Sequence, residues 1–182
     1  MPRLFMLAAV LLLPFLPLAP LSALADQVDG TPVDRVGTGA TIASFENGLA
    51  AYLKGDYLKA VDLFRLTAAE GNAAARYYLG MAYEQGQGVA QDYSAATKWY
   101  QLAAEQGNAQ AQYRLGALYE YGTGVIQDYE RAFMWFDLSS ASGKYFGVTR
   151  RQLVAKKMTA EQIEDAKRME HDCQQRHLVD CG

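Results

Sequence analysis

Hydrophobic and polar residues follow a pattern that recurs every 36 residues through the middle of the chain. The stretch AARYYLGMAYEQGQGVAQDYSAATKWYQLAAEQGN (74–108) matches QAQYRLGALYEYGTGVIQDYERAFMWFDLSSASGK (110–144) at this offset throughout. A shorter copy, which begins FENGLAAYLKGDY, precedes them. Self-similarity of this kind is typical of stacked supersecondary units. We therefore expect three units, over residues 44–72, 73–108 and 109–144.

Each unit is predicted to form two helices, and in the second and third units the first helix begins after Asn72 or Asn108. Asn72 can accept a hydrogen bond as the N-cap of this helix. Apolar side chains then recur at helical spacing, at Tyr78, Leu79, Ala82 and Tyr83. Gly80 and Gly116 lie inside the first helices, where glycine costs about 1 kcal/mol of helix propensity. We expect a close helix–helix approach to compensate for that cost.

A glycine-containing turn separates the two helices of a unit. The motif G-x-G-V supplies the positive φ angles that end the first helix. An aspartate follows and can cap the second helix at the positive end of its dipole. The aspartates in question are Asp56, Asp92 and Asp128. Trp99 and Trp135 fall on the repeating apolar pattern, so we expect the second helices to bury them in the core.

The repeat pattern stops after Gly143, and residues 145–182 are predicted to form a helical cap. They contain a basic amphipathic stretch, GVTRRQLVAKK, and a second stretch in which Thr159 and Gln162 have the spacing of a capping box. Solenoids need such helices to seal the last repeat; a helix that docks on a partner is the alternative. The predicted fold class is all-α, an α-solenoid of three antiparallel helix hairpins with C-terminal capping helices.

The doubled motif L-G-x-x-Y-x-x-G-x-G-V-x-x-D-Y-x-x-A resembles that of the Sel1-like repeat family, which is related to tetratricopeptide repeats. The resemblance covers residues 44–144, although the first unit departs from it by a shorter loop. It implies an α-solenoid and an adaptor that binds other proteins. Some secreted, cysteine-rich members are associated with β-lactam binding or hydrolysis. A binder or hydrolase of β-lactams or peptidoglycan fragments is therefore the alternative function.

The first 25 residues are typical of a secretory signal. Arg3 precedes an uncharged apolar run, and Ala23-Leu24-Ala25 offers the small residues that signal peptidase requires. We expect cleavage after Ala25, export to the periplasm of a Gram-negative bacterium and no stable membrane insertion; an uncleaved anchor is the alternative. Residues 26–43 are rich in Gly, Asp and Thr, and they are predicted to form a flexible leader.

Charge and motifs exclude two classes of function. One of the 17 basic side chains lies in the signal, so 16 remain beside 20 acidic ones, which is not a basic footprint for nucleic acid. The chain has no S-x-x-K, G-x-S-x-G, H-E-x-x-H or Walker motif. The G-x-G elements follow helices rather than strands, so we interpret them as turns and not as phosphate sites. We expect no catalysis and no cofactor.

The last twelve residues, HDCQQRHLVDCG, hold every histidine and cysteine of the chain. Cys173 and Cys181 would lie about 12 Å apart along a continuous helix, too far for a disulfide or a shared zinc ion. The helix must therefore end between them, near His177. An oxidising compartment favours a disulfide. The C-x7-C spacing also resembles the clips of cysteine-rich family members, while zinc binding and free thiols remain alternatives.

If the units stack as the resemblance implies, the first helices line a concave face that binds a protein or peptide. Its residues would be Phe45, Leu49, Tyr52, Tyr77, Met81, Glu84, Tyr113, Ala117, Glu120 and Tyr121. Phe45, Tyr77 and Tyr113 form an aromatic row, and the repeated acids Glu84 and Glu120 would favour a basic ligand. The alternatives are that the tyrosines pack between repeats and that the acids form an ordinary solvated surface.

Overall fold

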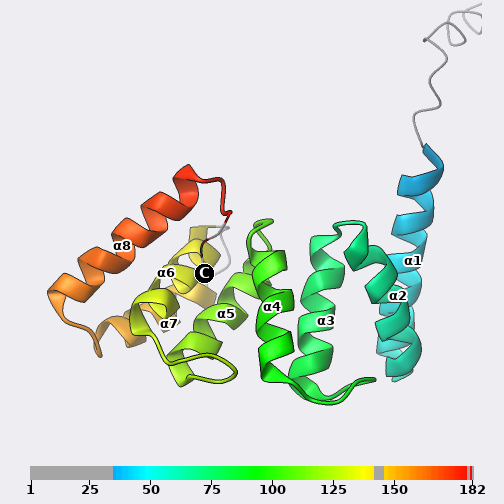
Figure 1. Cartoon of the computed structure of the whole chain (residues 1–182), viewed down its shortest axis with the longest axis horizontal. Helices are drawn as coiled ribbons and strands as arrows, with labels where there is room; N and C mark the ends of the chain where they lie inside the picture. The colour runs from blue at the N-terminus through cyan, green and yellow to red at the C-terminus, as the bar shows by residue number, and fades with distance from the viewer. Residues whose placement is uncertain (1–34, 142–145, 180, 182) are drawn as a thin grey trace, which may run out of the picture. The chain divides into compact units, whose positions relative to one another are not determined.

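The computed structural model describes residues 35–141, 146–179 and 181, and in this part of the chain it contains helices and no strands (Figure 1). The predicted signal, residues 1–25, lies outside the described residues. Contacts divide the chain into Met1–Arg35 and Val36–Gly182, and the second unit holds the helices. The helices are α1 (Arg35–Leu53), α2 (Tyr57–Ala69), α3 (Ala73–Gln85), α4 (Tyr93–Ala104), α5 (Ala109–Tyr121), α6 (Tyr129–Ala141), α7 (Phe146–Ala155) and α8 (Ala160–Gln175). Among the described helices, none combines the length and the apolar character that a membrane crossing requires.

The predicted caps and turns are confirmed. The side chains of Asn72 and Asn108 accept hydrogen bonds of 2.9 Å from the backbone N–H of Ala75 and Ala111, so α3 and α5 begin where expected. Asp56, Asp92 and Asp128 cap the second helices in the same way. Gly86 and Gly122 have φ of 70° and 67°, the left-handed conformation that ends a helix and is easy only for glycine.

Helix α1 begins at Arg35, so the prediction of a flexible leader over residues 26–43 is wrong for its last part. The sequence ATIASFENGLAAYL is rich in helix-forming residues and continues the helix toward the N-terminus. The shorter loop of the first repeat changes its register, because Gly48 corresponds to Gly80 and not to a residue 36 positions earlier. Both glycines face an aromatic ring of the second helix in their own repeat.

Close packing around the helix glycines is confirmed. A Cβ atom on Gly80 would lie 2.5 Å from the ring of Tyr100, and one on Gly116 would lie 2.7 Å from the ring of Phe136. Real Cβ atoms do not approach other atoms so closely, so only glycine lets the first helix rest on these rings. The contact buries both rings completely, at 0% exposure. Burial on this scale outweighs the lost helix propensity.

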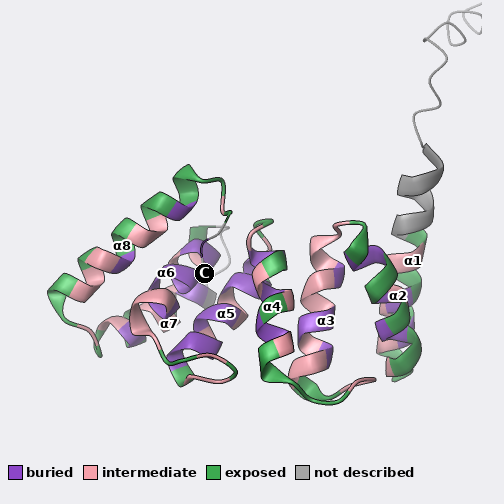
Figure 2. Ribbon diagram, in the orientation of Figure 1, coloured by how far each residue is buried: buried purple, intermediate pink, exposed green. Residues whose placement is uncertain are grey.

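Trp135 is fully buried, as predicted, but the prediction that Trp99 is a core residue is wrong. Trp99 is half-buried at the edge of the hydrophobic core, and its neighbour Tyr100 takes the core position on α4. Figure 2 shows that α4 has both buried and exposed segments. The difference follows from the neighbouring helices. Helix α6 is contacted by α5, α7 and α8, whereas α4 is contacted only by α3 and α5 among the described helices with substantial packing.

Helix α7 occupies the place of the first helix of a fourth repeat. It packs on α6 and also contacts α5, as α5 packs on α4 and contacts α3. Its buried Gly147 and Val154 follow the buried Ala111 and Leu118 by 36 residues. The prediction that the pattern stops after Gly143 is therefore wrong for this helix. The repeat persists there in register, although the recognisable motif has been lost.

Helix α8 leaves the repeat arrangement and packs on α6. Its capping box between Thr159 and Gln162 is present, as predicted. The helix ends at Gln175, and a disulfide joins Cys173 to Cys181 with a Cα–Cα distance of 5.2 Å. The chain reverses at His177, which has a φ of 53°. The predicted end of the helix between the cysteines is thus confirmed, and the disulfide occupies both sulfurs that zinc would need.

Candidate functional site

The four first helices, α1, α3, α5 and α7, present one apolar residue each at equivalent positions. Leu49, Met81 and Ala117 are half-buried. Leu153 on α7 follows Ala117 by 36 residues and is 43% exposed. We refer to these four residues as the first-helix row. Each of them reaches solvent, so the row is accessible to a partner on every first helix.

The predicted aromatic row is half-buried because each ring packs on a ring of the second helix in its own repeat. The ring-centroid distances are 5.9 Å for Phe45–Phe64, 5.8 Å for Tyr77–Tyr100 and 5.4 Å for Tyr113–Phe136. Such tilted aromatic pairs stabilise a fold beyond their buried area. Phe45, Tyr77 and Tyr113 therefore belong partly to the core, and they are not free surface anchors.

Tyr52 and Tyr78 join the first helices of the first two repeats. Their rings meet edge to face at a centroid distance of 5.5 Å, and Tyr52 also meets Tyr57 at 5.4 Å. Burial, and after it the neighbouring tyrosines, raise the pKa of Tyr52 and of Tyr78 above the usual value. The interface between α1 and α3 is therefore an uncharged aromatic contact.

Glu84 on α3 occupies the position that Tyr52 has on α1. Its carboxylate is paired with neighbouring side chains. It accepts a short hydrogen bond from the hydroxyl of Tyr100, and Arg114 of the following repeat lies 3.4 Å away. Its side chain is 20% exposed. Burial, and after it the Glu84 carboxylate, raise the pKa of Tyr100, so this hydroxyl stays protonated and donates. Glu84 links α3 to α4 and α5 at once.

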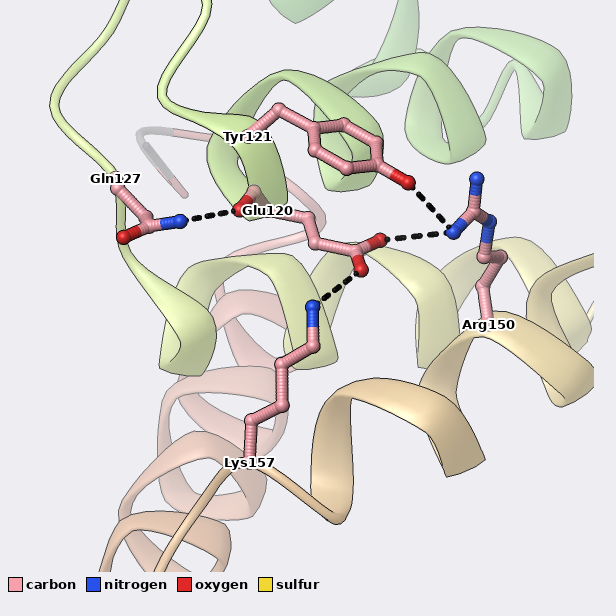
Figure 3. A network of polar contacts seen from close by, with 5 residues as sticks. All are labelled: Glu120, Tyr121, Gln127, Arg150 and Lys157. Carbon is pink, nitrogen blue, oxygen red and sulfur yellow. Dashed lines mark hydrogen bonds and ion pairs between the residues drawn. The ribbon is translucent and has the colours of Figure 1, made fainter.

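Glu120 is 2% exposed, so the prediction that it lies on an open face and favours a basic ligand is wrong. Its two oxygens lie 3.4 Å from Nη1 of Arg150 and 3.0 Å from Nζ of Lys157 (Figure 3). The side-chain amide of Gln127 donates to the Glu120 backbone carbonyl at 2.8 Å. The cause of the burial is α7 and the turn after it, which bring Arg150 and Lys157 to the carboxylate. A buried carboxylate needs such partners.

Tyr121 is the most exposed of the predicted aromatic residues, at 58%. Its hydroxyl accepts a hydrogen bond of 2.8 Å from Arg150, whose guanidinium lies 5.6 Å from the centre of the ring. Hydrogen bonds to Tyr113 and Tyr121, together with Glu120, raise the pKa of Arg150. Tyr121 therefore stands at the surface in a fixed orientation, beside a permanent positive charge.

Sequence reasoning missed the cations of this face. Arg114, Arg150 and Lys157 were not among the predicted site residues, yet they neutralise the predicted acids. A signal was present, because Arg150 follows Arg114 by the repeat length of 36 residues, as Glu120 follows Glu84. The recognisable motif ends at Gly143, before Arg150, so the motif alone does not reveal this correspondence.

The described residues contain no group of three or more His, Cys, Asp and Glu side chains that could hold a metal ion. The ionisable side chains of the first-helix face are arranged as ion pairs between helices. This arrangement holds Glu84 and Glu120 in fixed positions between neighbouring first helices.

The comparisons agree with this geometry. The Sel1 repeat family model matches residues 39–72, 73–108 and 109–144. The c5321 protein, a protective antigen of uropathogenic Escherichia coli strains that displays an SLR fold, is similar at 35% identity with a TM-score of 0.74, over 80% of this chain and 32% of that one. A Sel1 repeat protein from Oxalobacter formigenes is similar at 28% identity with a TM-score of 0.60, over 66% of this chain and 51% of that one.

This chain thus spans about a third of the first of these proteins and about half of the second. No curated protein is significantly similar to it. The matched repeats cover more than half of the sequence, and the structure shows the repeated hairpins that they imply. The chain belongs to the Sel1 repeat family.

Proposed function

We propose that this protein is an exported scaffold that binds a protein partner on the face formed by its first helices. Sel1 repeat proteins generally mediate protein–protein interactions. The observation that supports this face most is the first-helix row, Leu49, Met81, Ala117 and Leu153, which stays accessible across three repeats and the cap. Partner residues would dock along this row, on the face that the family resemblance makes concave.

The second helices form a less suitable binding face. Their exposed leucines, Leu66 and Leu102, are 61% and 41% exposed, but the equivalent Leu138 is only 5% exposed. A row that ends in a buried residue cannot continue into the cap. The first-helix row continues there, because α7 stacks as a fourth first helix. A partner that spans several repeats is therefore better served by the first helices.

Site-specific photo-cross-linking tests the proposed face. A photoreactive residue at Ala117, on the first helices, is compared with one at Leu102, on the second helices, in cells that express the chain. We expect a discrete cross-linked protein from position 117 and none from position 102. Cross-linking from position 102 alone would reject the first-helix face.

Export is a part of the proposal with its own support. The disulfide between Cys173 and Cys181 is of a kind that persists in oxidising compartments. Residues 1–25 have the composition of a cleaved signal. We expect the purified periplasmic protein to begin at Asp26, as N-terminal sequencing would show. A chain that keeps Met1 and stays in the cytoplasmic fraction would contradict export.

A further inference from the structure

Positive charge is concentrated in the segment that contains α7. Residues 138–160 contain five lysines and arginines and no aspartate or glutamate, although the whole chain has a net charge of −3. Arg151 pairs with Asp137 on α6, and Arg150 and Lys157 pair with Glu120 on α5. This segment is therefore basic within an acidic protein.

Arg150 and Lys157 share a single carboxylate. Their side chains are 31% and 43% exposed, whereas Glu120 between them is 2% exposed. Two partly exposed cations beside one buried anion leave net positive charge at the surface. In Figure 3, Arg150 and Lys157 reach the Glu120 carboxylate from different directions. A negatively charged group that approaches this surface is attracted and meets no exposed acid of the network.

Arg150 is held in place by its neighbours. Its Nη1 atom donates to Glu120 and to the Tyr121 hydroxyl, and Tyr113 is a third partner. A guanidinium has five N–H donors in a planar fork that matches a carboxylate. The three partners take three of the five, so the others can reach a ligand. Because the Arg150 side chain is already held in one orientation, binding would cost little further side-chain entropy.

Apolar side chains lie next to these cations. Leu153 is one turn beyond Arg150 on α7 and is 43% exposed, and Tyr121 is 58% exposed. We call Tyr121, Arg150, Leu153 and Lys157 the cationic patch. It combines a guanidinium, an ammonium group and two side chains with apolar surface, at the end of the first-helix row.

We propose that the cationic patch binds an extended acidic segment of a partner protein, with a carboxylate on Arg150 and Lys157 and an apolar side chain on Leu153 and Tyr121. This inference rests on the proposed function, since it specifies the partner of the same face. A single pre-oriented guanidinium favours an individual carboxylate over a diffuse anionic surface. With only two apolar side chains, the patch offers little for insertion into a membrane.

Fluorescence anisotropy with three labelled peptides tests the inference on the full chain. The peptides alternate leucine with glutamate, glutamine or lysine and are otherwise identical. We expect the glutamate peptide to bind at least about tenfold more tightly than the glutamine peptide, as a charge-assisted hydrogen bond predicts. Arg150→Gln should remove most of this preference, and Leu153→Gln should weaken the binding of both peptides. Arg168→Gln, which changes an exposed arginine on α8, should leave both affinities unchanged.

Circular dichroism checks that each variant is folded, and Leu153→Gln keeps every ion pair of the network if Arg150→Gln does not fold. Equal binding of the three peptides, or tighter binding of the lysine peptide, overturns the inference. Displacement of the glutamate peptide by phosphatidylserine vesicles, but not by neutral phosphatidylcholine vesicles, also overturns it. The patch would then be a membrane site. Cross-linking from Ala117 can succeed while these peptide results fail, so the two proposals are tested separately.

Discussion

Glu120 on α5 and Arg150 on α7 form an ion pair at 3.4 Å, the same distance that separates Glu84 on α3 from Arg114 on α5. Both acids and both arginines are one repeat length apart in the sequence. The contact between consecutive first helices is therefore a repeated structural unit. Helix α7 supplies the arginine of this ion pair. A segment without the family motif can therefore still pack on the last repeat.

Gly116→Ala should destabilise the protein although alanine is the better helix former. The new Cβ would lie 2.7 Å from the Phe136 ring, and overpacking of this kind costs about 1–3 kcal/mol. The gain in helix propensity is only about 1 kcal/mol. Urea denaturation should therefore show a lower free energy of unfolding. In a Phe136→Leu background the same change should become neutral or stabilising, and a stabilising effect in the wild-type background would contradict the close packing.

Removal of the disulfide should loosen the C-terminal tail. Cys173→Ser with Cys181→Ser opens a short loop whose closure contributes about 2.5 kcal/mol on the chain-entropy estimate. The Leu178 amide, which donates to the Cys173 carbonyl at 2.9 Å, should lose protection from hydrogen exchange. As a control, His171→Ala with His177→Ala should leave stability unchanged, because both histidines are exposed. Loss of stability in the histidine variant together with bound zinc would contradict the disulfide.

The stability of the cap should fall as the pH rises toward neutrality. Burial, and after it the charge of Asp137 on α6, raise the pKa of Glu170 on α8 to about 7, against the opposing effect of Arg151 on α7. Because the folded state holds the proton more tightly than the unfolded state, the stabilisation is complete below pH 4.5 and is lost as the pH rises through about 7.

Glu170→Gln should remove this part of the pH dependence. Above pH 7 the variant should be more stable than the wild type by roughly 1 kcal/mol, a value reduced for partial exposure. Thermal melts between pH 5 and pH 8 measure the effect. Glu164→Gln, an exposed acid on the same helix, is the matched control. An unchanged pH profile in Glu170→Gln would show that the fold does not raise the pKa of Glu170.

Features that depend on neighbouring residues in the chain could be predicted from the sequence. The caps at Asn72 and Asn108, and the glycine turns at Gly86 and Gly122, are set by local hydrogen bonds and by the φ angles that glycine allows. The hairpins therefore appear at the expected residues. The burial of Trp99 could not be predicted in this way, because it depends on which helices cover α4.

The residues predicted for the candidate face lie on α1, α3 and α5, but the burial of Glu120 was not predicted. Glu120 has the spacing of a surface residue on its own helix. It is buried because α7 and the turn after it pack there and place Arg150 and Lys157 against it. Interactions between residues 30 and 37 positions apart are invisible to a reading of one helix. The correspondence of Arg114 with Arg150 can be seen in the sequence only if the 36-residue spacing is continued past the point where the motif ends.

A double-mutant cycle on Glu120 and Arg150 tests most directly the claim that the acids of this face are internal partners. The free energy of unfolding is measured for Glu120→Gln, Arg150→Gln and the double variant, with the exposed pair Glu164 and Lys167 as the control cycle. We predict a coupling of about 1–2 kcal/mol for Glu120 and Arg150 and near-additivity in the control. Additive effects at Glu120 and Arg150, equal to the control within error, would contradict this prediction.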